Sequence, residues 1–513
     1  MAKRTIQLAL NRVEGDLEFQ LELEAGKIVD ARCVGTLYRG FEQILIGRNP
    51  WDALVITPRI CGICSTAQLL ATVKALEHIG GITPPPAAVR IRHLCLMAEI
   101  VQNDLRQTFL FFTADFCHPK YAQQAFFEQA RSNFLPFKGR MHLEALQNSR
   151  HIVELIALFG GQWPHSSFMV PGGVTHPASD NQIIDALTIL QQFTRWFEQR
   201  VLGCNLEVWL NLATYDDFFN WLSAKAEHAQ SGIGQFTSIS RALGLHTLGQ
   251  GTPYMLSYGS LDTADSVRGH PLMGQNLNNA GCYNGITGLT EALDQNAISE
   301  HVQYSWFQPY PGGLHPSKGV TIPDYQPHSE RYTWCKAPRY QDHVVQTGPL
   351  ADALVQGEPL ITALYRAEGD NAWLRQFARL RRTARLLNSM QASLKILAAS
   401  PNEQHILRGI STELQDGEGY GLVTAARGAL GHWVEVREGK IRRYQVVTPT
   451  AWNASPKDSA GRHGHWEQSL IGLKVDDPDD PVEIGHIIRS HDPCLVCTVH
   501  VAKAEQPYQV WPG

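Results

Sequence analysis

Two pairs of cysteines, each with two residues between its members, are the part of this sequence best suited to chemistry. Cys61 and Cys64 lie near the start of the chain, and Cys494 and Cys497 lie near its end. Both sulfurs of such a pair reach the same side of a turn, so two pairs offer four thiolates to one metal. Soft thiolate ligands favour zinc, iron–sulfur clusters, copper(I) or a thiophilic nickel or iron centre. Structural zinc and a thioredoxin-like redox pair are the alternatives, although neither pair shows the βαβ pattern that a redox pair needs.

The composition describes a large globular chain. Of 513 residues, 43% are hydrophobic and 18% are charged, and the net charge of −5 provides no basic field that would attract nucleic acid. The ten cysteines are too sparse for a disulfide framework. No apolar run reaches the roughly 18 residues of a membrane span, and the first residues lack a signal segment. These features predict a reducing compartment and a partner that covers part of the surface.

Apolar spacing predicts a mainly helical body with small β elements near both ends, an α+β fold. Residues 17–34 and 433–447 alternate apolar and polar side chains around short turns, so each segment predicts a hairpin. Helical spacing marks three long segments: one opened by the prolines at 84–86, one that Asp180 is expected to cap, and one that starts at Trp373. Their apolar stripes predict core positions rather than cofactor contacts.

The third of these helices also carries an arginine-rich face, which we expect to be solvated, with a docking surface as the alternative. Its members are Arg375, Arg379, Arg381, Arg382 and Arg385. Loops rich in Gly, Pro and His are predicted at 160–178, 308–327 and 448–466. Because no flexible linker separates these parts, we expect a single large domain.

The residues around the cysteine pairs narrow the choice of metal. The first pair stands in RICGIC (59–64) and the second in DPCLVCTVH (492–500). Together they resemble the paired signatures of the large subunit of nickel–iron hydrogenases. The resemblance covers nearly the whole chain in the family's order, through RVEG (12–15), RGFE (39–42), PH (164–165), PGG (171–173), HP (315–316), KAPRY (336–340), GPL (348–350), RGALGHW (427–433), PT (449–450) and WN (452–453).

The resemblance implies that all four cysteines bind nickel. Cys61 and Cys494 would be terminal ligands, and Cys64 and Cys497 would bridge to an iron that carries carbonyl and cyanide. Heterolytic cleavage of H2 needs an open metal site and a nearby base, and by resemblance the Cys494 thiolate is that base. Glu14 matches the family's glutamate beside this thiolate, and a carboxyl group can pass the proton onward by reorientation.

Further matches concern the surroundings of the metal. By resemblance, the guanidinium of Arg427 hangs over the open metal site, where a fixed cation can polarise H2; an ordinary salt-bridged arginine is the alternative. Thr450 matches a hydroxyl that hydrogen-bonds a cyanide. Three positions depart from the commoner pattern: Gln68 stands where many relatives have a histidine, Ala426 replaces a proline, and Thr424 replaces a glutamate. These departures leave all four cysteines in place.

A second metal site is implied at Glu42, His500 and the backbone carbonyl of Val446, which match a magnesium-like site. A carboxylate and a carbonyl suit a hard cation, whereas an imidazole is a less usual ligand for it. Glu42 and His500 could alternatively form a plain ion pair.

The end of the chain bears on the choice between an enzyme and a sensor. Residues 1–500 match the hydrogenase domain, and 501–513 match a tail that a nickel-dependent endopeptidase removes from catalytic relatives; a plain surface segment is the alternative. Sensor relatives generally lack this tail. Gln68 and Ile63 resemble the subgroup of cytoplasmic uptake enzymes and hydrogen sensors. Ile63 with Phe109 or Phe111 would narrow a gas tunnel, unless the phenylalanines are ordinary core.

We therefore predict the catalytic subunit of a nickel–iron uptake hydrogenase that oxidises H2 to protons and electrons. The six remaining cysteines show no cluster spacing, so the electrons would pass to an iron–sulfur small subunit. A maturation endopeptidase, nickel-insertion factors and a higher oligomer of heterodimers complete the expected partners. The expected compartment is the cytoplasm, with peripheral membrane attachment through partners. The alternatives are a hydrogen-sensing subunit, a scaffold like the quinone-site subunit of respiratory complex I, and a structural zinc protein.

Overall fold

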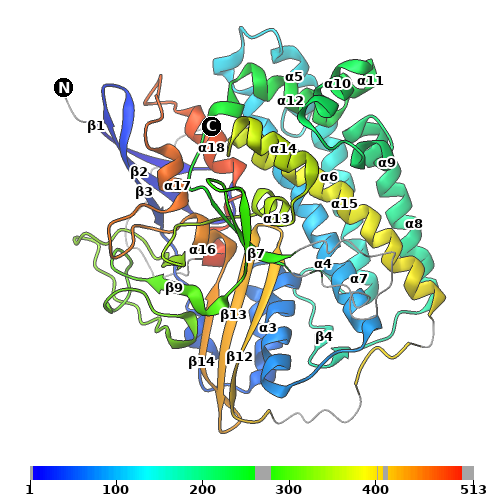
Figure 1. The fold of residues 1–513 in the computed structure, drawn as a ribbon, viewed down its shortest axis with the longest axis vertical. Coiled ribbons are helices and arrows are strands. Elements are labelled where there is room, and N and C mark those ends of the chain that lie inside the picture. The colour runs from blue at the N-terminus through cyan, green and yellow to red at the C-terminus, as the bar shows by residue number, and fades with distance from the viewer. Residues whose placement is uncertain (1–3, 260, 262–278, 401–402, 408–413, 499–513) are drawn as a thin grey trace.

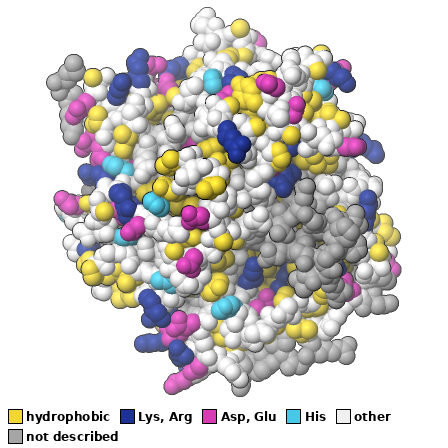
Figure 2. Space-filling view, in the orientation of Figure 1, with side chains coloured by type: hydrophobic (Ala, Val, Ile, Leu, Met, Phe, Trp, Pro, Cys, Tyr) yellow, Lys and Arg dark blue, Asp and Glu magenta, His cyan; other side chains and the backbone are white. Residues whose placement is uncertain are grey.

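The computed structural model describes residues 4–259, 261, 279–400, 403–407 and 414–498, with side chains up to Val496. Helices form one half of the molecule and small sheets flank them, so the mainly α, α+β prediction is confirmed (Figure 1). On the face in Figure 2, acidic and basic side chains are interspersed rather than gathered by sign. None of the described helices is long and apolar enough to cross a membrane.

The predicted N-terminal hairpin is present and gains a third strand. Strands β1 (Arg4–Leu10), β2 (Leu17–Glu24) and β3 (Lys27–Gly35) form an antiparallel sheet in chain order. The alternating apolar residues of β2, such as Phe19 and Leu21, are fully buried on one face of the sheet. This sheet packs against the aromatic-rich segment around Trp334 and against helices α17 (His465–Leu470) and α18 (Val482–Ser490).

The C-terminal hairpin is likewise present and extended by one strand. Strands β12 (Gly417–Ala425), β13 (Gly428–Arg437) and β14 (Lys440–Val447) form an antiparallel sheet. Helix α3 (Ser65–Gly80) lies directly on β12. A Cβ atom at Gly421 would stand 1.9 Å from the carbonyl oxygen of Ala71, so glycine is what lets strand and helix touch. The contact brings Cys64, just before α3, beside the β12–β13 turn.

All three long predicted helices occur. They are α4 (Pro86–Arg106), which continues as a wider π-helical turn over Gln107–Phe112, α8 (Asp180–Trp196) and α15 (Ala372–Ala399). The predicted cap of α8 is wrong by one residue: Ser179 caps the helix, because its hydroxyl accepts from Gln182 N, and Asp180 is the first helical residue. Helix α15 crosses the helical half and packs against α4 and α8 (Figure 1).

The expectation of a solvated arginine face on α15 is wrong. The side chains of Arg375, Arg379 and Arg381 are at most 3% exposed, and Arg382 and Arg385 are partly buried. Their acidic partners come from other segments: Asp370 pairs with Arg375, Asp104 and Asp492 with Arg379, Glu358 with Arg381, and Asp104 and Asp352 with Arg382. A buried arginine needs such partners, and the local sequence pattern contains almost none of them.

The remaining described elements connect these parts. The shorter helices are α1 (Phe41–Leu45), α2 (Ala53–Ile56), α5 (Phe127–Phe134), α6 (Arg140–Ile152), α7 (Glu154–Gly160), α9 (Leu206–Leu210), α10 (Tyr215–Ala224), α11 (Ala226–Gln230), α12 (Gly232–Ala242), α13 (Pro349–Val355), α14 (Pro359–Glu368), α16 (Pro449–Asn453), α17 (His465–Leu470), α18 (Val482–Ser490) and α19 (Leu495–Thr498). The other strands are β4 (Met169–Val170), β5 (Gly173–Val174), β6 (Tyr254–Tyr258), β7 (Ala280–Asn284), β8 (Leu289–Ala292), β9 (Ile298–His301), β10 (Ala337–Tyr340) and β11 (Gln346–Thr347). Part of the predicted 448–466 loop is therefore helix α16, which carries Thr450.

Candidate metal centre

Cys61 and Cys494 stand side by side although they lie near opposite ends of the chain. Their Sγ atoms are 3.6 Å apart, and both side chains are almost fully buried. Two thiolates bound tetrahedrally to one metal at about 2.3 Å lie roughly 3.8 Å apart, whereas a disulfide holds its sulfurs at about 2.05 Å. The pair therefore fits two ligands of one thiophilic metal.

Main-chain pairing holds the C-terminal cysteine loop to an N-terminal segment. Glu14 N donates to Pro493 O at 3.1 Å, and Leu495 N donates to Glu14 O at 2.6 Å. Gly15 has a φ of +85°, and a Cβ atom there would stand 2.8 Å from Val496 N. Because only glycine fits both conditions, the RVEG segment clasps the C-terminal cysteine loop closely.

Arg39 ties the two cysteine segments together. Its Nη2 donates both to the carbonyl of Ile60, just before Cys61, and to the carbonyl of Val496. The RGFE segment was part of the sequence signature, but this clamping contact could not be read from it. One guanidinium thus fixes the N-terminal and C-terminal loops relative to each other.

Cys64 lies at the start of α3 and contacts the side chain of Gln68 one helical turn later. Gln68 Nε2 is 4.0 Å from Cys64 Sγ, and Gln68 Oε1 is 2.7 Å from His432 Nε2. All three side chains are buried. His432 belongs to the RGALGHW segment, yet the sequence contained no sign of its contact with Gln68.

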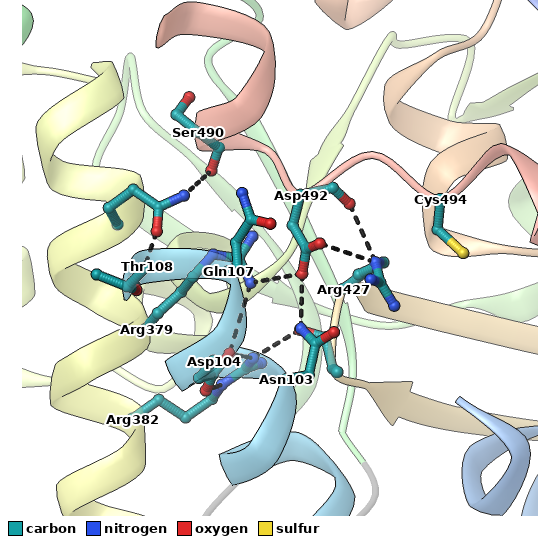
Figure 3. Close-up of polar contacts among 12 residues, drawn as sticks. Asn103, Asp104, Gln107, Thr108, Arg379, Arg382, Arg427, Ser490, Asp492 and Cys494 are labelled. Carbon is teal, nitrogen blue, oxygen red and sulfur yellow. Dashed lines mark hydrogen bonds and ion pairs between the residues drawn. The ribbon is translucent and has the colours of Figure 1, made fainter. Parts of the chain in front are cut away.

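Arg427 projects from the β12–β13 turn toward the thiols. Its Nε donates to Asp492 Oδ1 at 3.0 Å, and its buried Nη1 has no hydrogen-bond partner among the described residues. Burial alone would lower the pKa of Arg427, but attraction to Asp492 and Cys494 outweighs it and holds the pKa well above its ordinary value. Figure 3 shows the guanidinium between these two residues. The arginine is therefore both salt-bridged and left with a donor to offer at the site.

Asp492, which the sequence reading did not single out, anchors Arg427 to the helical body. Asn103 Nδ2 on α4 donates to Asp492 Oδ2 at 2.6 Å, and Arg379 Nη1 on α15 lies 3.3 Å from the same oxygen. Asp104 is shared by Arg379 and Arg382 at 3.5 and 2.6 Å. These contacts converge on the loop that leads into Cys494 (Figure 3).

The predicted proton carrier, Glu14, is half-buried next to the cysteine pair. Burial and then the nearby Cys61 thiolate raise the pKa of Glu14 above its ordinary value. Such a carboxyl takes up a proton more readily than one in water. Its backbone pairs with residues 493 and 495 on either side of Cys494.

Thr450 and Ala426 also lie beside the cysteine loop or its anchor. Thr450 Oγ1 accepts a hydrogen bond from Cys494 N at 3.2 Å, which leaves its own hydroxyl proton to donate. The carbonyl of Ala426 accepts from Arg382 Nη2 at 2.6 Å and so connects the turn before Arg427 to α15. Both residues are buried.

A second polar cluster surrounds Glu42. Val446 N donates to Glu42 Oε1 at 2.9 Å, and both residues line a cavity with Glu300 and Lys336. Burial raises the pKa of Glu300 to about 7, although Lys336 opposes this shift. Glu300 and Lys336 were not predicted as site residues. His500 lies outside the described residues.

Several predicted residues near the site either lie outside the described part or have ordinary packing partners. The side chain of Cys497 and residues 501–513 lie outside the described part, in which no group of three or more His, Cys, Asp or Glu side chains forms a ready-made metal site. Phe109 is fully buried and stacks on Phe134, whereas Phe111 lies under Arg106. Both phenylalanines thus have ordinary packing partners, and Ile63 is also buried.

Comparison with known proteins identifies the family. The family described as nickel-dependent hydrogenase matches residues 39–135 and 137–500, so this chain belongs to that family. The periplasmic NiFeSe hydrogenase large subunit of Desulfomicrobium baculatum is 31% identical over 97% of this chain and 94% of its own. The uptake hydrogenase large subunit of Afipia carboxidovorans is 26% identical over 97% and 95%. The structure of an H2-activated NiFeSe hydrogenase of Dm. baculatum superposes with a TM-score of 0.81 at 29% identity, covering 97% of this chain and 100% of that one.

Proposed function

We propose that this large subunit oxidises H2 at a nickel–iron centre that the two cysteine pairs would hold, with Cys64 and Cys497 as the ligands that nickel would share with an iron carrying carbonyl and cyanide. The observation that carries the proposal is the buried approach of Cys61 and Cys494 Sγ at 3.6 Å. The donor set fits the group, because soft thiolates suit nickel and iron. A centre of this kind supplies the open coordination position at which H2 is cleaved heterolytically.

The residues of this chain then handle charge and protons. The permanently charged guanidinium of Arg427 interacts electrostatically with the thiols, and its Nη1 has no hydrogen-bond partner among the described residues, so it can polarise H2 without reorganisation. Cys494 Sγ takes the proton, and the Glu14 carboxyl accepts it and releases it by reorientation. Burial raises the pKa of Glu14, which supports this role. Thr450 Oγ has a proton to donate to a cyanide on the iron.

The cluster at Glu42 is proposed to hold Mg2+ or another hard divalent cation, with the Val446 carbonyl and His500. Its support is the acidic oxygens of Glu42 and Glu300 around one cavity. Magnesium in this place would tie β14 to the C-terminal end of the chain.

The partners and compartment follow from the same assignment. An iron–sulfur small subunit receives the electrons, and a maturation endopeptidase acting after His500 and nickel-insertion factors complete the centre. We keep the cytoplasm as the proposed compartment, while one relative is named as periplasmic. No observation of the structure favours the hydrogen-sensing alternative.

The test is H2-dependent reduction of a viologen dye by the complex with its small subunit. The Glu14→Gln variant should keep its nickel and iron but lose about 100-fold or more in rate, in the range of lost acid–base catalysis. Glu24→Gln, at an exposed end of β2, is the matched control and should leave the rate unchanged. A fully metallated complex that does not turn over H2, or one that contains zinc instead, would contradict the proposal.

A further inference from the structure

A chain of buried polar side chains runs from Cys64 away from the metal centre. Gln68 Nε2 faces Cys64 Sγ at 4.0 Å, Gln68 Oε1 faces His432 Nε2 at 2.7 Å, and His432 Nδ1 is 2.8 Å from Tyr444 Oη. Thr72 Oγ1 adds a contact 3.2 Å from the same Nδ1. These side chains come from α3, β13 and β14.

The protonation states of these groups decide which atom donates in each of these hydrogen bonds. Burial lowers the pKa of His432 to about 3, so its imidazole is neutral, with one donor and one acceptor nitrogen. Burial raises the pKa of Tyr444, which therefore stays a phenol that can donate to Nδ1. When Nδ1 accepts from Tyr444, the ring proton of His432 is on Nε2, which donates to Gln68 Oε1.

The direction decides which end of the Gln68 amide meets Cys64. With Oε1 held by His432, the N–H group points at the sulfur. The reversed amide would set a carbonyl oxygen against a thiolate, and two acceptors repel. A histidine that accepts from Tyr444 thus fixes Gln68 as a hydrogen-bond donor to Cys64.

We propose that His432 is a positioning residue that tunes the electron density of the Cys64 thiolate through Gln68. The inference rests on the proposed function, because it takes Cys64 as the ligand that bridges to iron. Hydrogen bonds to ligating sulfurs, and the partners behind them, set the electronic properties of a metal site. His432 acts through Gln68, which it contacts directly.

The test is the infrared carbonyl band of the purified heterodimer, together with its nickel and iron content. In His432→Phe the amide of Gln68 loses its fixed orientation, so Cys64 becomes a stronger donor and the band moves to lower wavenumber. His432→Gln keeps an N–H group near the Nε2 position and should restore the wild-type band. His78→Phe, an exposed change at the other end of α3, is the control and should not move it.

A second set of variants separates the relay from a general packing effect. Gln68→Leu should shift the band in the same direction, and adding His432→Phe to it should shift the band no further. Three results would each overturn the inference. They are additive shifts in the double variant, an unmoved band in fully metallated His432→Phe, and a His432→Gln band that matches that of His432→Phe.

Two further outcomes complete the design. If His432→Phe takes up no metal, Tyr444→Phe removes the donor while Thr72 remains, so a smaller shift to lower wavenumber supports the relay and an unmoved band contradicts it. A wild-type heterodimer without carbonyl and cyanide bands would instead contradict the proposed function. Failure of the relay and failure of the function are therefore distinguishable.

Discussion

The two cysteine loops meet at one place, but the protein holds them by different means. Around Cys64 the contacts are largely neutral: Gln68, His432, Tyr444 and Thr72 form one buried hydrogen-bonded set. Around Cys494 the contacts are ionic, with Asp492 joined to Arg427 and Arg379. The side chains next to Cys64 are therefore joined by neutral hydrogen bonds, whereas those next to Cys494 are joined by ion pairs.

The difference shows where each loop obtains its rigidity. The Cys64 loop leads directly into α3, whose first N–H groups, at Thr66 and Ala67, are bonded by the buried Glu99 carboxyl. Within the described residues, the Cys494 loop is followed by the four-residue helix α19, and side chains from α4, α15 and the β12–β13 turn hold it in place. A loop of this kind is ordered only when those distant elements are already in place.

Removing the central charge of the C-terminal loop should have the largest effect. Asp492→Asn leaves the buried Arg427 and Arg379 without their shared carboxylate, and breaking a buried pair costs about 3–5 kcal/mol. The free energy of unfolding of the heterodimer in denaturant measures this loss. Asp476→Asn, whose partner Lys474 and own side chain are both largely exposed, is the control and should change stability by less than about 1 kcal/mol. Equal effects of the two variants would show that the ionic set does not hold the loop.

A pH-dependent contribution to stability should come from the other loop. Burial raises the pKa of Glu99 to about 7, despite the N–H donors of Thr66 and Ala67 that favour its charged form. The folded state thus holds this proton more tightly than the unfolded state, in which the carboxyl has its ordinary pKa of 4.5. The stabilisation is complete below pH 4.5 and is lost as the pH rises through 7, by about 3 kcal/mol at 1.36 kcal/mol per pKa unit.

Glu99→Gln removes this titration and keeps the shape of the side chain. Relative to the wild type, the variant should be more stable at pH 8 than at pH 5, as read from denaturant unfolding at both values. Glu24→Gln at an exposed position is the control. A stability difference that is the same at both pH values would contradict the shifted pKa. Glu300, whose pKa burial also raises to about 7, keeps its own pH dependence in every variant.

The clamp between the loops should have a smaller effect. Arg39→Lys loses the planar fork that reaches the carbonyls of Ile60 and Val496. We expect a loss of about 2 kcal/mol, the scale of a hydrogen bond to a charged group, together with faster loss of nickel to a chelator. Arg48→Lys, an exposed arginine bonded to Ile44 O, should match the wild type in both measurements. A nickel-release rate unchanged by Arg39→Lys would show that Arg39 does not hold the two loops together.

The smallest effect is expected at the far end of the neutral network. Thr57 Oγ1 lies 2.7 Å from Thr72 Oγ1 and 2.8 Å from Ala53 O. Thr57→Val keeps the side-chain shape and should cost about 1 kcal/mol, the scale of one neutral hydrogen bond. Thr188→Val, at an exposed threonine of α8, is the comparison and should be nearly neutral. If Thr57→Val lowered the free energy of unfolding as much as Asp492→Asn, the neutral and ionic contacts would contribute equally, contrary to our expectation.

The hairpins and long helices could be predicted because their apolar periodicity lies within short windows. The alternation of Leu17, Phe19 and Leu21 places one face of β2 in the core, as observed. Strand β1 falls within the first 35 residues, which the sequence predicts as strands, but its own pattern is weak because its side chains are exposed or half-buried. Strand β12 was not predicted. The arginines of α15 were misjudged because partners such as Asp104 and Asp492 lie far away in sequence.

The candidate site was located more completely than it was explained. The signatures included Arg39, Asp492 and His432 within their motifs, but a motif does not reveal which atom meets which. The sequence allows Arg427 to be either a site residue or a salt-bridged one. In the structure, Nε bonds Asp492, while Nη1 has no partner among the described residues. Contacts between segments hundreds of residues apart depend on packing of the whole body, which local spacing does not encode.

The central claim is that both cysteine pairs meet on one nickel ion, and X-ray absorption at the nickel edge of the purified heterodimer tests it most directly. We predict one nickel per large subunit with four sulfur neighbours and one iron nearby, and three sulfur neighbours in metallated Cys497→Ser. Nickel bound by only two sulfurs, or zinc in place of nickel in the mature complex, would contradict the account.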